Sequence, residues 1–244
     1  MGVGAVGRAH RRTRVRVGAD AAVAGADGSG PGAPVSEFVD DGLVRCDWAT
    51  GSQLYRDYHD HEWGKALHGD DAMFERLCLE AFQSGLSWIT ILRKRPAFRA
   101  AFAGFEIAKV AEFDDTDRAR LLADAGIVRN RAKIDAAIAN ARVARDLPIG
   151  LDELVWSFAP EPRPRPATIA DVPATTPESI ALAKELKRRG FAFVGPTTAY
   201  ALMQATGMVD DHLAVCWVQA VPKGTDSGVR FATQVSARVG NREE

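Results

Sequence analysis

Residues 185–216 read ELKRRGFAFVGPTTAYALMQATGMVDDHLAVC, and they predict the end of one helix, a glycine-containing bend and the start of another helix. The first of these helices begins at Thr176 and Pro177, because proline lacks the amide hydrogen that would have no partner in a first turn. Basic side chains favour its last turn, and Gly190 ends it. The second helix begins near Thr197. This part of the chain is therefore predicted to be a pair of helices joined by a short bend.

Helical periodicity extends upstream to about Leu43, where small residues and turn formers give way to aromatic and apolar residues. Asp70 is expected to cap a helix that runs to about Ser84, because apolar side chains recur on one face there. Other helices are predicted at 86–94, from Pro96 onward, at 116–122 with Thr116 as the cap, and at 131–146. An extended segment is predicted at the prolines Pro160, Pro162, Pro164 and Pro166. No strand alternation occurs, so the fold class is predicted to be all-α.

Composition indicates one globular domain. The 244 residues are 46% hydrophobic and 26% charged, with a formal net charge of −1. This balance argues against a nonspecific binder of polyanions, but not against a DNA enzyme, because steering depends on where charges cluster. No run of about 18 apolar residues suggests a membrane span. Three cysteines are too few for a disulfide framework, so we expect cytosolic thiols or metal ligands in a monomeric cytoplasmic protein.

The two ends of the sequence differ from the middle. Residues 1–42 begin with several arginines and continue with glycine, alanine and proline, without the apolar core of a secretion signal. We expect a disordered extension, or residues upstream of the true start; an organelle transit peptide is a weaker alternative because serine is scarce. The domain is predicted at 43–220, followed by a flexible tail at 221–244.

Four residues could form a metal site. Cys46 and His59 lie near the start of the predicted domain, and His212 and Cys216 lie near its end. The second pair is spaced i, i+4, which places both side chains on one face of a helix. Two cysteines and two histidines suit a closed tetrahedral zinc site that would join the two ends of the domain. Because no compact finger spacing is present, buried thiols and hydrogen-bonded histidines remain the alternative. Cys78 is expected in the core.

A catalytic metal site is a rival interpretation of the stretch at 59–62, which reads HDHE. Its two histidines are spaced i, i+2 and would diverge on a helix, and the metalloprotease pattern of two histidines at i, i+4 around a glutamate is absent. A metallohydrolase is therefore disfavoured.

Aromatic residues cluster around one acidic residue. The cluster comprises Trp48, Tyr55, Tyr58, Trp63 and Trp88, together with Glu80. Flat rings a base's thickness apart would suit a base taken out of the DNA stack. A carboxylate among apolar rings needs a partner, and a cationic alkylated purine would supply one. A plain aromatic core and an exposed Glu80 are the alternatives.

The bend between the last two helices could contact DNA. Gly195 permits close approach of a backbone, and amides near Thr197 could hold a phosphate at the start of the helix. Arg188 and Arg189 would add electrostatic attraction. A second glycine bend at 124–131 carries two more arginines. A charged helix end in solvent is the alternative for each basic cluster, and without other signals it is the favoured one.

Together these stretches resemble the DNA-3-methyladenine glycosylase I family, within the helix-hairpin-helix DNA glycosylases. The similarity lies in RCDWA at 45–49, LYRDYHDHEWG at 54–64, FERLCLEAFQSGLSWITILRKR at 74–95, DAGIVRNRAKI at 124–134 and the stretch at 185–216. It covers about Leu43 to Trp217.

The resemblance implies one structural zinc ion held by Cys46, His59, His212 and Cys216. It also implies that Glu80 and Tyr58 hydrogen-bond the base, that Trp48 and Trp88 pack against it, and that Tyr55 lies nearby. The expected activity is monofunctional excision of 3-methyladenine from double-stranded DNA. A zinc-stapled DNA-binding module without chemistry is the alternative.

One position departs from the family pattern. Many helix-hairpin-helix glycosylases carry a catalytic aspartate in a Val-Asp-x-His string, whereas the methyladenine branch commonly has asparagine there. This chain has Asp210 at that position. Asp210 either stabilises positive charge on the sugar or caps the helix that carries His212.

Overall fold

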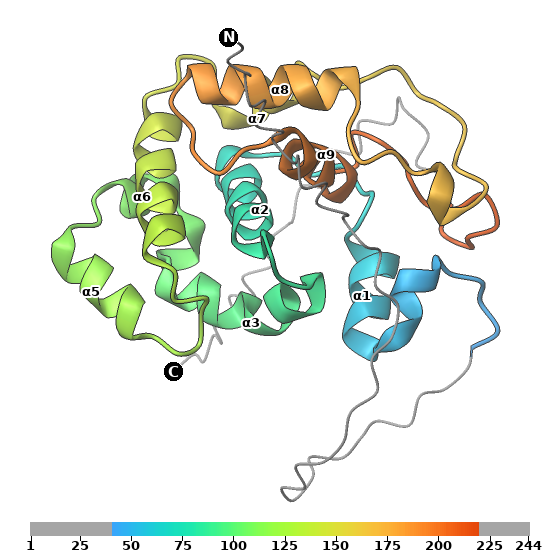
Figure 1. Ribbon diagram of the computed structural model, residues 1–244, viewed down its shortest axis with the longest axis horizontal. Coiled ribbons are helices and arrows are strands. Elements are labelled where there is room, and N and C mark those ends of the chain that lie inside the picture. Colours follow the sequence, from blue (N-terminus) through green and yellow to red (C-terminus); the bar gives the residue numbers. More distant parts are fainter. Residues whose placement is uncertain (1–40, 220–244) are drawn as a thin grey trace, which may run out of the picture. The chain divides into compact units, whose positions relative to one another are not determined.

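The computed structural model describes residues 41–219, all of which fall in one compact unit (Figure 1). In chain order the described elements are η1 (Asp47–Gly51), α1 (Gln53–His61), α2 (Asp70–Gln83), α3 (Trp88–Ala101), η2 (Ala103–Phe105), α4 (Ile107–Ala111), α5 (Asp115–Ala123), α6 (Arg131–Arg145), α7 (Leu151–Trp156), η3 (Ile169–Asp171), α8 (Pro177–Arg188) and α9 (Pro196–Ala205). Within this range every regular element is helical, so the all-α prediction is confirmed.

Helix α2 is the centre of the core. It contacts α3, α6, α7 and α9, and Figure 1 shows it among those helices. Nearly every side chain from Met73 to Phe82 is buried, which is the pattern of a helix covered on all sides. Glu80 lies inside this buried run, so the fold itself places a carboxyl group in an apolar setting.

Three predicted helix starts are corrected by the structure. Gly69, not Asp70, is the N-cap of α2; the Asp70 carboxylate instead accepts a hydrogen bond from the backbone amide of Asp152 at 2.8 Å. Asp114 caps α5 in place of Thr116, because its carboxylate reaches two first-turn amides. Pro96 lies inside α3 rather than at a helix start. A proline removes only one hydrogen bond there, and buried side chains on both sides of it hold the helix together.

The predicted pair of helices is confirmed as α8 and α9, which pack against each other. Thr176 and Pro177 open α8 as expected, with a capping box between Thr176 and Ser179. The bend is fixed by buried Asn140 of α6, whose side-chain amide donates to the Ala192 carbonyl oxygen at 3.1 Å and accepts from the Ala192 amide at 2.8 Å. The bend is therefore attached to the core.

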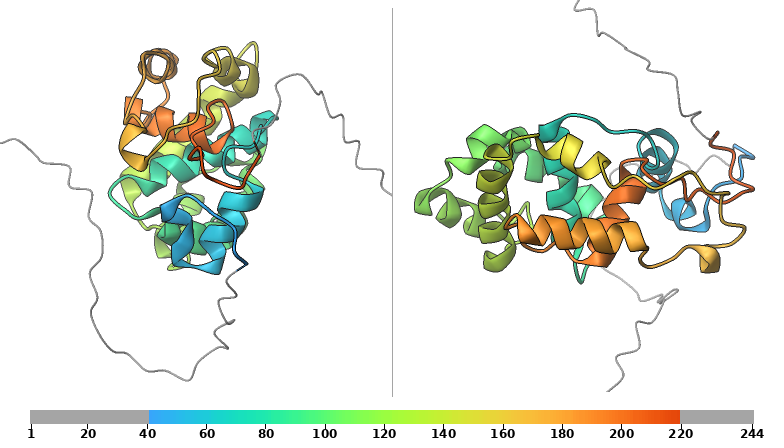
Figure 2. Two further views of the ribbon diagram at one scale, coloured as in Figure 1. Left: turned by 90° about the vertical axis from the view of Figure 1, so that its right-hand side faces the viewer. Right: turned by 90° about the horizontal axis from the view of Figure 1, so that it is seen from above.

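The last described segment returns to the start of the domain. The Trp217 amide donates to the Val44 carbonyl oxygen at 2.8 Å, and the Ala214 amide donates to the Pro166 carbonyl oxygen at 2.9 Å. Residues 210–218 form turns rather than a helix, so the prediction that His212 and Cys216 share a helix face is wrong. Figure 2 shows this red-orange segment beside the blue start of the described chain.

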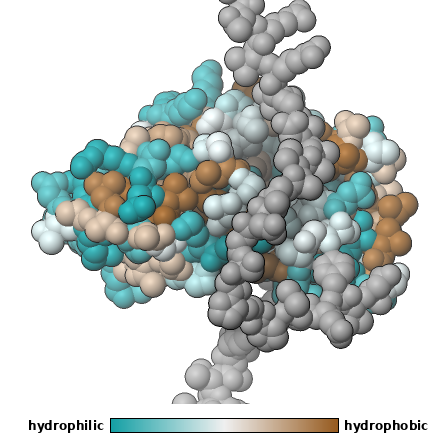
Figure 3. All heavy atoms as spheres, turned by 60° about the horizontal axis from the view of Figure 1, so that its bottom comes forward, coloured by the Kyte–Doolittle hydropathy of each residue, from teal (hydrophilic) through white to brown (hydrophobic). Residues whose placement is uncertain are grey.

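Figure 3 shows one face of the described part, on which hydrophilic residues surround smaller hydrophobic areas. No helix in residues 41–219 is long and apolar enough to cross a bilayer. The extension predicted at 1–42, apart from its last two residues, and the tail predicted at 221–244 lie outside the described residues.

Candidate functional site

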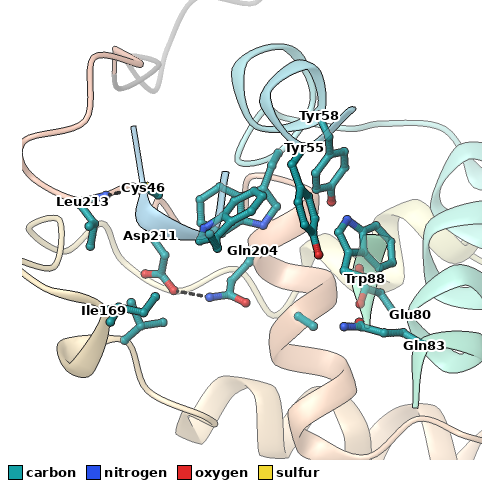
Figure 4. Close-up of a pocket in the computed structure, with 14 residues that line it drawn as sticks. Cys46, Tyr55, Tyr58, Glu80, Gln83, Trp88, Ile169, Gln204, Asp211 and Leu213 are labelled. Carbon is teal, nitrogen blue, oxygen red and sulfur yellow. Dashed lines mark hydrogen bonds between the residues drawn. The ribbon is translucent and has the colours of Figure 1, made fainter. Parts of the chain in front are cut away.

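A cavity of about 280 Å³ opens between α1, α2, the start of α3, and α9 (Figure 4). It is close to the lower end of the volumes usual for small-molecule sites. The structure brings to its walls all the residues that the sequence suggested for base binding: Trp48, Tyr55, Tyr58, Glu80 and Trp88. Residues that are distant in sequence therefore meet in one place, as a binding site requires.

The aromatic rings contact one another around this space. The ring centroids of Trp48 and Tyr55 are 5.7 Å apart, and those of Tyr58 and Trp88 are 5.4 Å apart. The Tyr55 hydroxyl accepts a hydrogen bond from the Ile89 amide at 2.9 Å, and the Tyr58 hydroxyl accepts one from Arg76 at 3.1 Å. Both hydroxyls keep a proton to donate, so the wall combines flat apolar surface with fixed polar tips.

Glu80 is 5% exposed and accepts no hydrogen bond from another described residue. Burial raises its pKa to about 7, although the nearby charge of Arg76 opposes the shift. The buried indole nitrogen of Trp88 also has no hydrogen-bond partner in the described part of the chain. Figure 4 places these two side chains on the same wall. An unpaired acceptor and an unpaired donor at one cavity favour a bound ligand that is polar at its edge.

Arg76 is held away from Glu80 by other partners. Besides its bond to Tyr58, it lies 3.5 Å from the Glu62 carboxylate. Arg95 donates two hydrogen bonds to the Glu62 carboxylate, at 2.5 and 2.7 Å. Arg76 lies over the Tyr58 ring, 5.4 Å from its centroid. This network fixes the tyrosine and leaves the Glu80 carboxylate without a direct ion pair.

The opposite wall contains polar residues that the sequence analysis missed. Asp211 is buried and accepts hydrogen bonds from Arg163 at 2.6 Å, from the Tyr200 hydroxyl at 2.6 Å and from the Gln204 side-chain amide at 2.8 Å. Because a carboxylate only accepts, the Gln204 nitrogen must face Asp211, and its oxygen points the other way (Figure 4). Trp63 of the predicted aromatic cluster also lines the cavity, together with Gln83 and Leu213. The side chains of Gln83 and Leu213 carry no sequence signal that separates them from core residues.

The four residues predicted to bind a metal converge beside the cavity. Their ligand atoms all lie within 4.8 Å of one another, and all four residues are buried. The Nε2 atom of His59 is 3.2 Å from Nδ1 of His212, and Sγ of Cys216 is 3.5 Å and 3.6 Å from those two atoms. Sγ of Cys46 is 3.9 Å from Nδ1 of His212. A tetrahedral zinc ion implies separations of about 3.3–3.8 Å between such ligands, so the residues fit a metal.

The second nitrogen of each imidazole has an acceptor. Nδ1 of His59 is 2.8 Å from the Asp60 carboxylate, and Nε2 of His212 is 3.2 Å from the Trp63 carbonyl oxygen. Asp60 is itself held by Arg45 and the Trp217 indole. Burial lowers the pKa of both histidines, that of His212 to about 4, which favours the neutral ring that binds metals. Acceptors behind ligating histidines are typical of metal sites.

A family model described as methyladenine glycosylase matches residues 48–219. The chain belongs to the methyladenine glycosylase family. It is 45% identical over 179 residues to DNA-3-methyladenine glycosylase 1 of Escherichia coli, covering 71% of this chain and 96% of that protein.

Solved structures agree with this family assignment. A crystal structure of 3-methyladenine DNA glycosylase I is similar with a TM-score of 0.69 and 44% identity, covering 71% of this chain and 98% of the other. A variant of 3-methyladenine DNA glycosylase I in complex with 3-methyladenine is similar with a TM-score of 0.68 and 33% identity, covering 71% of this chain and 96% of the other.

Asp210, the position at which this chain departs from the family pattern, does not line the cavity. Its carboxylate pairs with Arg165 at 2.8 Å and accepts the His212 amide at 3.3 Å. Because no helix follows, the interpretation of Asp210 as a helix cap is wrong. The buried carboxylate of this pair that reaches the cavity is the neighbouring Asp211.

The hairpin residues suggested for DNA contact are placed around the α8–α9 bend. Gly195 is the N-cap of α9, and the space around its α-carbon is open. Thr197 is exposed in the first turn. Arg188 and Arg189 both bind the Glu185 carboxylate, with contacts of 2.6 and 2.7 Å. The bend leaves a helix start accessible, whereas much of the nearby arginine charge is already balanced.

Proposed function

We propose that this protein is a monofunctional DNA glycosylase that excises 3-methyladenine from alkylated double-stranded DNA in base excision repair. The family assignment supports this class of reaction. The observation that carries the proposal is the buried, unpaired Glu80 carboxylate on the wall of an aromatic cavity.

In this proposal the protein recognises the methylated base by its positive charge and its planar shape. Methylation at N3 makes the base of the nucleotide cationic, and a nearby positive charge would lower the pKa of Glu80 and favour its ionised form. Tyr58 would donate a hydrogen bond to the base, while Trp48, Trp88 and Tyr55 would contact its faces and edge. Ordinary adenine lacks the positive charge and would leave the buried carboxylate without compensation.

The reaction in this proposal needs little acid catalysis. The damaged nucleotide leaves the stack, the bond from C1′ to the base breaks, and the base leaves with the bonding electrons. Water then adds to C1′ and loses a proton. No lysine lines the cavity within the described residues, which supports a product with an intact abasic site rather than strand cleavage through a Schiff base.

The metal in this proposal is one structural zinc ion at Cys46, His59, His212 and Cys216. A closed set of four protein ligands leaves no open position for water, which disfavours a metallohydrolase. Its role would be to fasten the two ends of the domain beside the cavity.

DNA contact in this proposal involves the helix-hairpin-helix element formed by α8 and α9. Backbone amides at Gly195 and Thr197 would hold a phosphate at the positive end of α9. Arg188 and Arg189 would add a smaller attraction because Glu185 partly neutralises them. One chain supplies the whole cavity, which supports a monomer, and three free cysteines support a reducing compartment such as the cytoplasm.

The proposal is tested with purified protein and DNA treated with a methylating agent. The protein should release 3-methyladenine, detected chromatographically, and leave strands that break only after added base. Release of no base, or strand cleavage without base, would contradict it. DNA binding without release would instead support the alternative, a zinc-stapled binding module.

A further inference from the structure

We infer that Arg93, Arg129 and Arg131 form a second surface that holds the phosphate backbone of duplex DNA, beside the cavity and separate from the α8–α9 bend. The inference deepens the proposed function and rests on it, since duplex DNA is the partner. We call this set the rim arginines. Arg129 and Arg131 flank Asn130, the N-cap of α6, and Arg93 lies in α3.

The rim arginines differ in pairing from the other exposed arginines. Of the other arginines classed as exposed within residues 41–219, five each pair with a carboxylate: Arg99, Arg120, Arg145, Arg163 and Arg188. The sixth, Arg142, donates to the carbonyl oxygens of Ala111 and Phe113 at 2.9 and 2.7 Å. The rim arginines are exposed and have no ion-pair partner in that part of the chain. Three uncompensated guanidinium groups on a chain of net charge −1 are available for an external anion.

Two lysines, Lys94 and Lys133, connect the segments that carry the rim arginines to neighbouring parts of the fold through hydrogen bonds. Lys94 is half-buried and Lys133 is buried. Lys94, next to Arg93, donates to the carbonyl oxygens of Ala125 and Gly126 at 2.9 and 3.1 Å, which ties α3 to the bend before α6. Lys133 in the first turn of α6 donates to the carbonyl oxygens of Phe82 and Ser84 at 2.9 and 2.6 Å.

The second lysine joins the start of α6 to the end of α2. The loop that follows α2 connects Gln83 with Trp88, and both of these residues line the cavity. The rim arginines are therefore held at a fixed position relative to the opening through which a base would enter.

Nearby acidic groups do not neutralise this surface. Asp124 is the only acidic residue between 124 and 131, and its carboxylate accepts the Gly126 amide at 2.7 Å. The first turn of α6 contains no acidic residue, and Asp135 further along is paired with Arg118 at 2.8 Å. The positive end of α6 and the guanidinium groups thus act in the same direction, which suits a row of phosphates rather than a single small anion.

The test measures how duplex binding depends on salt. The probe is a fluorescent duplex with one stable tetrahydrofuran abasic analogue, and its affinity is measured by anisotropy over a series of salt concentrations. The double variant R129A/R131A should reduce the magnitude of the slope of log K against log salt by about 2, roughly 1 per arginine. R129K/R131K should keep the wild-type slope, because the slope counts charges.

The matched control is K109A/R145A, which removes the same charge from exposed ion pairs. Arg145 lies 14 residues along α6 from Arg131, about 21 Å at the rise of a helix. The control should keep the wild-type slope. Equal slopes for R129A/R131A and K109A/R145A, or a lysine variant that behaves like the alanine variant, would overturn the inference. A wild-type protein that releases no 3-methyladenine would instead refute the proposed function.

Discussion

Burial of Glu80 lowers the stability of the protein when the cavity is empty and favours binding of a cationic base. Helix α2 buries the carboxyl group, and the resulting desolvation raises its pKa from 4.5 to about 7. Ionising it in the free protein therefore costs about 3 kcal/mol relative to the unfolded chain. A cationic ligand at the same place would remove that cost, so the group is destabilising when the cavity is empty and useful when a positive base fills it.

Glu80→Gln should stabilise the free protein in a pH-dependent manner. Because the folded pKa is raised, the stability that Glu80 contributes is present below about pH 4.5 and is lost as the pH rises through about 7. Glutamine does not titrate. The free energy of unfolding of the variant should equal that of the wild type near pH 4.5 and exceed it by about 3 kcal/mol at pH 8. Urea unfolding at both pH values measures this, and a constant difference would contradict it.

Asp210 and Asp211 are adjacent aspartates, so the same substitution to asparagine at each position can be compared directly. Asp210→Asn should leave excision within about 3-fold of wild type and cost less than about 1 kcal/mol, because its ion pair with Arg165 is partly exposed and outside the cavity. Asp211→Asn should cost about 2–3 kcal/mol, because the new amide meets three donors on a buried wall. Thermal unfolding and single-turnover excision compare the two, and a larger loss of activity for Asp210→Asn would refute this assignment.

At the scale of elements, Asn140 determines where the α8–α9 bend lies. Its two hydrogen bonds to Ala192 imitate a pair of backbone bonds and hold the bend against α6. Phe193 follows with a positive φ of 58°, an uncommon conformation for a bulky residue, which shows that the bend is strongly constrained.

Asn140→Ala should cost about 2 kcal/mol and weaken duplex binding, because it leaves the Ala192 amide and carbonyl without their partners and frees the bend. The free energy of unfolding and the duplex affinity are the readouts. Undiminished affinity in a destabilised variant would mean that the bend does not need this bond to contact DNA.

The sequence predicts the helices better than it predicts their ends and connections. Apolar periodicity, Thr176 with Pro177 and the glycines after helices locate α2, α6, α8 and α9 closely, because those signals are local. Pro96 is misleading because tertiary packing keeps α3 intact around it. The segment from Asp210 to Trp217 is not helical because its contacts with Cys46, Val44 and Pro166 are long-range and leave no local pattern.

The same limit applies to the site. Residue type and resemblance suffice to select Glu80, the aromatic residues and the four Cys/His residues as candidates, and the fold places them at the cavity and in the cluster beside it. Residue type and resemblance do not distinguish Asp211 from Asp210, because the two are neighbours in sequence. Only the fold shows that Asp211 binds Arg163, Tyr200 and Gln204 at the cavity, whereas Asp210 pairs with Arg165 outside it. The sequence also does not reveal that Glu185 pairs with Arg188 and Arg189 and offsets part of their charge; this is seen only in the structure.

At the scale of the whole described chain, the Cys/His cluster closes a long loop. His59 and His212 are 153 residues apart in sequence, yet their ring nitrogens are 3.2 Å apart, next to a cavity that Cys46 also lines. A metal here would stabilise the fold by joining distant segments, and its loss would open the wall of the cavity.

Removal of the proposed zinc ion should therefore destabilise the fold and reduce excision together. Treatment with a strong chelator should lower the melting temperature by about 10 °C or more, and activity should fall in parallel with helical content. Circular dichroism and excision assays on one sample measure both. Inactivation with an unchanged melting temperature would indicate a catalytic metal and contradict the structural role.

The most direct measurement is the single-turnover rate of 3-methyladenine release by the wild type, Glu80→Gln and Glu75→Gln on the same methylated duplex. Glu75 lies on the same helix but pairs with Arg99, so it controls for the loss of one carboxylate from α2. We expect a fall of at least about 100-fold for Glu80→Gln and little change for Glu75→Gln. Release by Glu80→Gln at the wild-type rate would contradict the claim that this buried carboxylate selects the cationic base.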